Sequence, residues 1–218
     1  MSGAPRGAGG PLADRLRLMV LTDPRPACGR PLEEIVRACV AAGATAIQLR
    51  DKSADAEGLY RQALRLAPIV TDGGALFLID DRFDVALAAG AHGVHLGPED
   101  LPVAAVRKVV PPGFLIGAST DDPATARRLA AEGADYLGVG AVYGTGSKPG
   151  LAEEAIGPGR VAEVAAAAGI PCVGIGGIAE SNAAEVFAVG AGIAVLSAVM
   201  SSPDPASRVR ALLLGVDR

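Results

Sequence analysis

Aromatic residues are nearly missing from this chain of 218 residues: they make up 3% of it, and tryptophan is absent. Half of the residues are nevertheless apolar, so the core has to be built from alanine, valine, leucine and isoleucine. Such a core is typical of parallel strands that are buried on both faces and covered by alanine-rich helices. The length suits one large α/β domain.

Cysteine, positive charge and long apolar runs are also scarce. The three cysteines, Cys28, Cys39 and Cys172, fit neither a zinc site nor a redox pair, which predicts free thiols in a reducing cytoplasm. The net charge of −4 argues against a nucleic-acid partner. The longest apolar run, Val186–Met200, is interrupted by two glycines and is shorter than the ~20 residues of a membrane span. We therefore expect a cytoplasmic protein with neither a nucleic-acid nor a membrane partner.

Short apolar runs alternate with helical stretches along the chain. Strands are expected at Leu16–Thr22, Ala44–Leu49, Ala75–Ile79, Gly93–Leu96, Phe114–Ala118, Tyr136–Gly140, Pro171–Ile175 and Ile193–Leu196. Helices are expected at Leu32–Ala42, Asp55–Ala67, Arg82–Ala89, Val103–Val109, Pro123–Ala131, Gly159–Ala168, Ser181–Val189 and Pro205–Leu214. Glycine follows many of these helices, at the left-handed position where it carries no Cβ penalty.

The unit of a strand followed by a helix recurs about eight times, as in a (β/α)8 barrel. A doubly wound open sheet is the rival, but it concentrates its ligand groups at one switch point. Here polar groups follow nearly every strand, and only a barrel brings all those ends to one face. The prediction is an α/β fold with a single (β/α)8 TIM barrel over residues 15–218, preceded by a flexible, Gly/Ala/Pro-rich tail over residues 1–14.

Two acidic turns, Asp80-Asp81 and Glu99-Asp100, end the third and fourth expected strands. Asp81 and Asp100 are candidate magnesium ligands, because magnesium is held by one or two carboxylates together with substrate phosphates and water. Each is also placed to cap the helix that follows, a role that does not exclude metal binding.

Alternation along the second strand puts Gln48, Arg50 and Lys52 on one face and apolar residues on the other. The two cations suit phosphate binding. An exposed strand end with a surface pair between Arg50 and Asp51 explains this segment equally well.

Residues 142–150, after the sixth strand, combine glycines with Thr145, Ser147 and Lys148. Such a loop can wrap an anion with its N–H groups and close as a lid, or be a flexible surface loop. Glycine-rich residues 174–178 and residues 195–198 end the last two strands, where barrels often bind phosphate. The residues alone thus indicate two anion subsites in a transferase or lyase acting on phosphorylated small molecules.

Two further polar side chains have competing roles. Ser119, at the end of the fifth strand, either binds a ligand or caps the helix near Pro123. His95 is expected to be a hydrogen-bonded core histidine rather than a base, and His92 a surface residue.

Several blocks of this chain resemble the thiamine-phosphate synthase (thiamine-phosphate pyrophosphorylase) family. The blocks are Leu21-Thr22-Asp23, Gln48-Leu49-Arg50-Asp51-Lys52, residues 81–87, residues 93–100, residues 135–140 and residues 173–178. They occur in order from about residue 16 onward, and the second and fourth are the most specific.

The resemblance implies that a pyrimidine diphosphate and a thiazole phosphate, the latter plain or carboxylated, are joined to give thiamine phosphate and diphosphate. It implies a dissociative, magnesium-assisted reaction. It assigns catalytic roles to Arg50, Lys52, Ser119 and Lys148 and magnesium binding to Asp81 and Asp100. It assigns the pyrimidine diphosphate to Gln48, Leu49, Arg50, Asp51, Lys52, Asp80, Ser119 and Lys148, and the thiazole phosphate to Thr145, Gly146, Ser147, Gly177, Leu196 and Ser197.

Asp80 departs from the family, which usually has asparagine there. The carboxyl can be protonated, join the metal shell or turn toward Arg82. A thiazole tautomerase-like isomerase, which lacks the magnesium carboxylates and has a histidine near Ser119, and a non-catalytic phosphate-binding barrel remain alternatives. The oligomeric state is open, with a homo-oligomer as one option.

Overall fold

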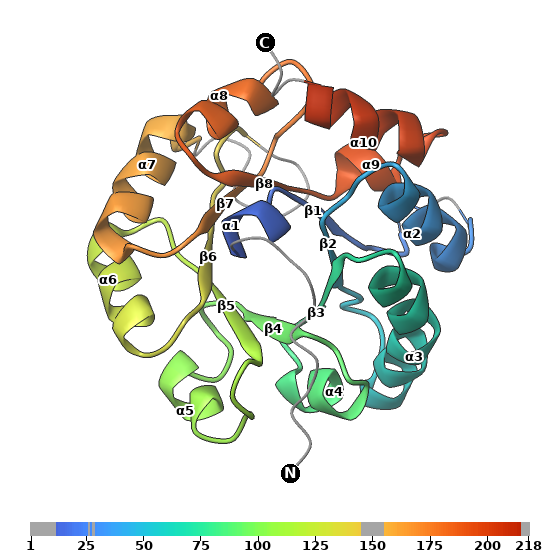
Figure 1. Ribbon diagram of the computed structural model, residues 1–218, viewed down its shortest axis with the longest axis horizontal. Coiled ribbons are helices and arrows are strands. Elements are labelled where there is room, and N and C mark those ends of the chain that lie inside the picture. Colours follow the sequence, from blue (N-terminus) through green and yellow to red (C-terminus); the bar gives the residue numbers. More distant parts are fainter. Residues whose placement is uncertain (1–11, 26, 28, 145–154, 215–218) are drawn as a thin grey trace.

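The computed structural model describes residues 12–25, 27, 29–144 and 155–214 (Figure 1). Its eight strands form one closed parallel barrel in sequence order, with the first strand beside the last, which confirms the predicted (β/α)8 barrel. The strands are β1 Leu18–Leu21, β2 Ala46–Leu49, β3 Leu76–Asp80, β4 Gly93–Leu96, β5 Leu115–Ser119, β6 Tyr136–Val139, β7 Cys172–Ile175 and β8 Gly192–Val195.

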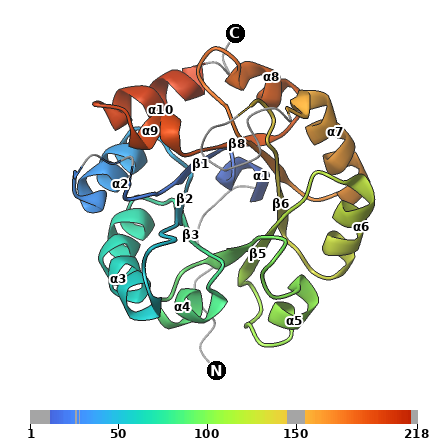
Figure 2. The ribbon, with the colours of Figure 1, turned by 180° about the vertical axis from the view of Figure 1, so that it is seen from behind.

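Helices surround the barrel as an outer ring, seen from both ends in Figures 1 and 2. They are α2 Leu32–Ala41, α3 Ala56–Asp72, α4 Phe83–Ala88, α5 Val103–Arg107, α6 Pro123–Ala131, α7 Gly157–Ala168, α8 Ala183–Ala188, α9 Ser197–Met200 and α10 Pro205–Leu214. None of the helices in the described ranges is long and apolar enough to cross a membrane.

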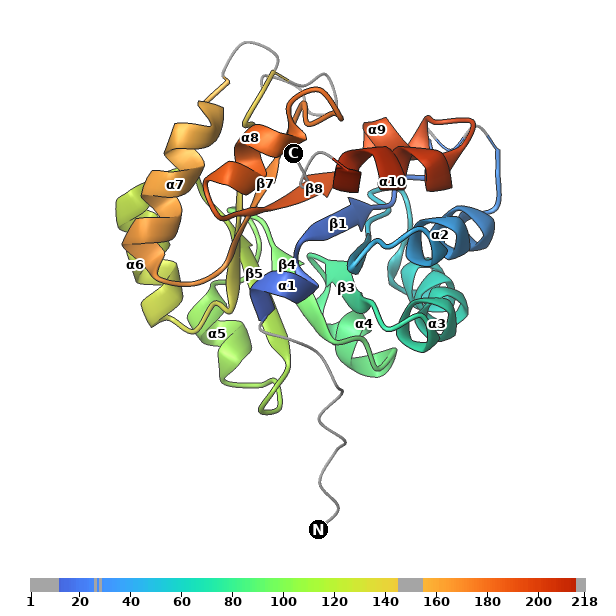
Figure 3. The same cartoon turned by 45° about the horizontal axis from the view of Figure 1, so that its top comes forward.

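A short helix, α1 (Leu12–Arg15), precedes β1 and lies at the end of the barrel where the strands begin (Figure 3). Its Leu12 packs against the side chains inside the barrel. This helix overlaps the end of the segment that the sequence predicts to be a tail; residues 1–11 lie outside the described ranges.

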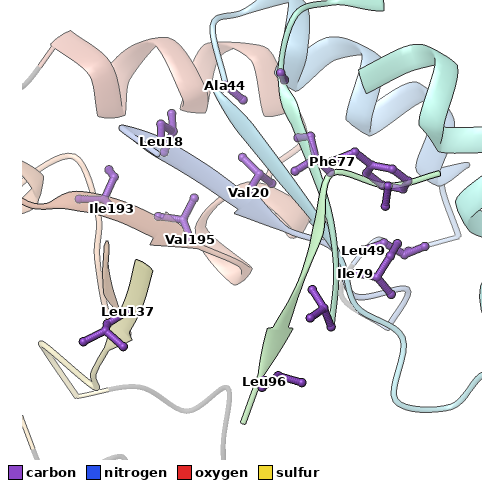
Figure 4. Close-up of a cluster of buried hydrophobic side chains, with 14 of the residues drawn as sticks. Leu18, Val20, Ala44, Leu49, Phe77, Ile79, Leu96, Leu137, Ile193 and Val195 are labelled. Atoms are coloured by element: carbon purple, nitrogen blue, oxygen red, sulfur yellow. The ribbon is translucent and has the colours of Figure 1, made fainter. Parts of the chain in front are cut away.

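Two apolar layers hold the barrel together. The outer layer lies between strands and helices and includes Leu49, Phe77 and Ile79 (Figure 4). The inner layer fills the barrel with side chains such as Met19, Leu78 and the fully buried Tyr136. Because alternate strand residues face alternate layers, the polar residues that continue an inner row emerge at the mouth of the barrel.

Glycine makes room for the largest side chain inside the barrel. A Cβ on Gly117 of β5 would lie 2.1 Å from Cζ of Tyr136. A Cβ on Gly138 of β6 would lie 3.0 Å from Cε1 of His95. Small residues on two strands therefore make room for one tyrosine and one histidine inside the barrel.

Gly117→Ala should destabilise the protein by about 1–3 kcal/mol, since overpacking a filled core forces side chains off their rotamers. Gly159→Ala is the matched control: nothing lies within 4 Å of its Cβ position on α7, and alanine favours the helix. Urea unfolding measures both variants, and equal stabilities would contradict the packing of Tyr136.

Besides α1, two helices differ from the prediction. The sequence predicts that the second helix, which begins at Asp55, ends at Ala67, but α3 continues through Pro68 to Asp72. Pro68 is exposed, so water can hydrate the carbonyl that it leaves without a partner, and the buried Leu66 and Val70 hold the helix on both sides. The short helix α9 was not predicted at all.

Candidate active site

Strand β1 fixes the end of β2. Oγ1 of the buried Thr22 accepts from the backbone N–H of Arg50 at 2.9 Å and donates to the Arg50 carbonyl at 3.1 Å. Oδ2 of Asp23 accepts from an Nη atom of Arg50 at 2.9 Å. Backbone and guanidinium of Arg50 are thus both held at the mouth of the barrel.

Lys52 lies between two carboxylates at the end of β3: Asp80, its last residue, and Asp81, the residue that follows. Its Nζ is 3.1 Å from Oδ2 of Asp80 and also binds Asp81. Nε of Arg50 is 3.7 Å from the same Asp80 oxygen. Burial alone would lower the pKa of Lys52, but the hydrogen bond to Asp81 and the charge of Asp80 raise it, so the ammonium keeps its charge.

Asp81 and Asp100 approach each other from β3 and β4. The backbone N–H of Asp81 donates to the carbonyl of His95 at 2.8 Å, and Asp81 adopts a φ of 61°. Oδ2 of Asp100 accepts from the backbone N–H of Gly97 at 2.6 Å. Burial and the charge of the neighbouring Asp81 carboxylate raise the pKa of Asp100.

The pair fits a divalent cation that completes its ligands from substrate and water. In the part of the chain that the structure describes, Lys52 pairs with Asp81 but makes no ion pair with Asp100, so negative charge remains that a cation would neutralise. Within the described ranges no group of three or more His, Cys, Asp or Glu side chains forms a metal site. Magnesium suits two carboxylates because it usually keeps water and phosphate ligands.

Asp80 lies near Arg50 and Lys52, the two cations that follow β2. Its backbone pairs with His95 of β4, and Arg82 binds Asp84 instead of Asp80, so the turn toward Arg82 considered from the sequence is not adopted. Burial and then the charge of Asp81 raise the pKa of Asp80 from 3.8 to about 6.

In the metal-free protein, Asp80→Asn should raise the free energy of unfolding above that of the wild type by about 1–3 kcal/mol at pH 7.5. No such increase is expected at pH 4.5. An acid with a raised pKa binds its proton more tightly when folded. Ionising it therefore costs stability as pH rises from about 4 to 6, and asparagine lacks this term. Urea unfolding in EDTA measures the difference.

Asp84→Asn is the control for this measurement. The hydrogen bond from Arg82 lowers the pKa of Asp84 below 3.8, so its contribution does not change between pH 4.5 and 7.5. An effect of Asp80→Asn that is the same at both pH values would contradict the buried, proton-binding environment of Asp80.

A row of polar groups crosses the interior beneath the cations. Nε2 of His95 lies 2.9 Å from Oγ of Ser119, and Nδ1 lies 3.0 Å from the Tyr136 hydroxyl. Burial raises the pKa of the Tyr136 hydroxyl, whereas Gln48, whose Nε2 donates to Sδ of Met19 at 3.7 Å, lies close enough to lower it. His95 is therefore a hydrogen-bonded core residue, as predicted, and Ser119 does not cap α6, whose cap is Asp122.

The other histidine differs from its prediction. His92 is half-buried, and its Nδ1 accepts from the backbone N–H of Phe77 at 3.0 Å. Its position just before β4 places the ring against the neighbouring strand rather than on the open surface.

Not every residue assigned by resemblance reaches this site with its side chain. Leu49 is buried in the outer apolar layer. Asp51 accepts from Ser53, Ala54 and Gln62 and so organises the turn into α3.

Gly177, Leu196 and Ser197 lie at the ends of β7 and β8, on the same face of the barrel. Gly177 has a φ of 64°, and a Cβ there would lie 2.7 Å from Cβ of Tyr143, so glycine is needed where these two loops meet. Thr145, Gly146, Ser147 and Lys148 lie outside the described residues.

Three contacts were not predicted from the sequence. Two are those of Thr22 and Asp23 with Arg50, and the third is that of Tyr136 with His95. Thr22 and Asp23 belong to one of the blocks that resemble the family, but no spacing in the sequence indicates that they contact Arg50. Tyr136 looks like an ordinary strand residue, and only barrel closure brings it to His95.

A closed (β/α)8 barrel with cations and paired carboxylates at the carboxyl end of its strands is typical of barrel enzymes that act on phosphorylated molecules. Residues 18–199 match the family model described as "Thiamine monophosphate synthase". The chain belongs to this family of transferases, as the resemblance indicated.

Individual proteins similar to this chain belong to the same family. A thiamine-phosphate synthase of Methanoculleus marisnigri is 48% identical over 200 residues, covering 89% of this chain and 92% of the relative. One of Coprothermobacter proteolyticus is 45% identical, covering 92% and 95%. The structure of thiamine phosphate pyrophosphorylase from Pyrococcus furiosus is similar, with a TM-score of 0.85, 39% identity and coverage of 95% and 98%. A 3-hexulose-6-phosphate synthase with 17% identity and a TM-score of 0.67 shares the fold alone.

Proposed function

We propose that this protein joins 4-amino-2-methyl-5-(diphosphooxymethyl)pyrimidine to 4-methyl-5-(2-phosphooxyethyl)thiazole, releasing diphosphate and giving thiamine phosphate. With the carboxylated form of the thiazole, carbon dioxide would be released as well. The observation that carries the proposal is the meeting of Arg50 and Lys52, which share Asp80, with Asp81 and Asp100 at one end of the barrel. The relatives that share most of the chain carry the same activity in their names.

The pyrimidine diphosphate would lie over β2 and β3. Arg50 offers a planar fork of N–H donors and Lys52 a point charge, and both suit phosphate oxygens. Gln48, Asp80 and Ser119 would contact the substrate, Lys148 would approach from its loop, and Leu49 and Asp51 would contribute through their main chain.

The thiazole phosphate would lie at the ends of β7 and β8. Glycine at 177 allows the main chain to approach a ligand closely, and barrels often bind phosphate between these two loops. Thr145, Gly146, Ser147, Leu196 and Ser197 complete the assignment.

The reaction would begin when the C–O bond of the pyrimidine methylene breaks and its electron pair leaves with the diphosphate. The thiazole nitrogen then donates its lone pair to the methylene carbon, which forms the C–N bond. Arg50, Lys52 and Lys148 would stabilise the charge that develops on the leaving group. No protein nucleophile or base is required, and the two subsites would hold the partners in line.

Magnesium would be held by Asp81 and Asp100. When bound, it would neutralise charge on the diphosphate oxygens and ease their departure. The protein's own part is to hold two carboxylates together and to keep Lys52 beside them.

Thiamine phosphate should form only when the purified protein receives both substrates and magnesium. Chromatography of the product, with each substrate alone as a control, measures this. If thiamine phosphate fails to form with both substrates and magnesium present, the proposal is wrong.

The same experiment separates the alternatives. A thiazole tautomerase-like isomerase would convert the thiazole phosphate alone, and a non-catalytic barrel would convert neither substrate. The synthase is favoured because Asp81 and Asp100 are both present and meet, and because residues 119–121 of the sequence, where the tautomerase has its histidine, are Ser-Thr-Asp. We further propose a cytoplasmic enzyme whose catalytic domain spans residues 15–218.

A further inference from the structure

We propose that Asp23 is a positioning residue, whose carboxylate aims the guanidinium of Arg50 at the diphosphate and thereby sets the affinity for that substrate alone. This inference rests on the proposed function, because it assumes that Arg50 binds the diphosphate. Asp23 itself touches no substrate in this account.

The first support is the way Asp23 is held. The residue is only 3% exposed, and its Oδ2 accepts from Arg50 at 2.9 Å. Thr22, the preceding residue, fixes the backbone of Arg50 through two hydrogen bonds. Two consecutive residues after β1 therefore determine where Arg50 lies and which way its side chain points.

The second support is what this contact leaves free. A guanidinium has five N–H donors in a rigid fork, and the structure commits one Nη atom of Arg50 to Asp23. Ordering an arginine side chain costs about 2 kcal/mol of conformational entropy. If Asp23 orders it in advance, the substrate does not meet that cost, and binding is correspondingly tighter.

The third support is the charge balance around Asp23. A lone carboxylate beside a diphosphate would repel it. Arg25 removes this difficulty, since it binds both oxygens of Asp23, with Nε at 3.0 Å from one and an Nη atom at 2.6 Å from the other. Because one carboxylate is shared by Arg25 and Arg50, these three side chains together carry a net positive charge. The hydrogen bond from Arg25 also lowers the pKa of Asp23, so the carboxylate is ionised at neutral pH.

Asp23→Asn tests the inference, because asparagine keeps the size but loses the charge and turns donors toward Arg50. The KM for the pyrimidine diphosphate should rise about tenfold or more, as expected for loss of a charged hydrogen bond. The KM for the thiazole phosphate should stay within about twofold. Calorimetry with inorganic diphosphate and magnesium should show a similar loss of affinity.

Two variants accompany Asp23→Asn. Combined with Arg50→Ala, it should add little further loss, because a residue that acts through Arg50 has no effect once Arg50 is gone. Asp135→Asn is the matched control at the opposite end of the barrel, where Asp135 pairs with Arg107 at 2.5 Å. It should lower the melting temperature and leave both KM values unchanged.

The outcomes separate the inference from the proposed function. If Arg50→Ala weakens diphosphate binding and Asp23→Asn does not, the inference is wrong and the function stands. If Asp23→Asn changes both KM values equally, or only lowers the melting temperature, the role is structural and the inference is wrong. If Arg50→Ala has no effect on diphosphate binding, the proposed site fails, and the inference fails with it.

Discussion

Replacing Asp81 or Asp100 by asparagine should reduce kcat/KM for thiamine phosphate formation by about 100-fold or more, the range seen when a group that holds or orients charge in an active site is removed. Asparagine keeps the shape but offers a neutral oxygen, which binds magnesium weakly. The two carboxylates meet from neighbouring strands, so each loss should be similar in size. Initial rates at several magnesium concentrations measure it.

Glu99→Gln is the matched control. Glu99 precedes Asp100 and is exposed, so it shares the local charge but not the contact with Asp81. Its variant should lose far less activity. Equal losses in all three variants would show that general negative charge matters rather than a defined cation site. Partial recovery at high magnesium in Asp81→Asn would support the assignment.

Lys52→Met should reduce kcat/KM by about 100-fold, since it removes a cation aimed at the leaving group. Lys52 is also the counterion that Asp80 and Asp81 share, so its loss leaves those carboxylates to repel the diphosphate. The remaining activity should depend strongly on pH and salt. Steady-state kinetics with the pyrimidine diphosphate as the varied substrate measure the loss.

Lys108→Met serves as the comparison for Lys52→Met. Lys108 is exposed at the end of α5. Its replacement by methionine changes the net charge by the same amount, but away from the site. It should keep nearly full activity. Similar losses in the two variants would mean that Lys52 acts only through the net charge of the protein.

The barrel could be predicted from the sequence because each unit carries its own local signals. Apolar runs mark the strands, and glycines mark the ends of helices: Gly43, Gly90, Gly133, Gly169 and Gly190 all have positive φ. The continuation of α3 through Pro68 could not be predicted, because it depends on which side of the helix faces water once the barrel has closed.

The site was predictable where it follows from alternation along one strand. Gln48 and Arg50 of the second strand do share a face, as period-two geometry requires. The contacts of Asp23 and Asp80 with Arg50 join three different strands, and no local pattern specifies them. Leu49 and Asp51 entered the predicted site only through a family block, and their side chains turn elsewhere.

Phosphorus-31 NMR of the wild-type reaction tests the central claim most directly. With both substrates and magnesium, inorganic diphosphate and thiamine phosphate should appear in equal amounts and at equal rates. EDTA should stop both signals, and added magnesium should restore them. Diphosphate release without thiamine phosphate, or product formation that continues in EDTA, would contradict the account of Asp81 and Asp100 as the cation site of a synthase.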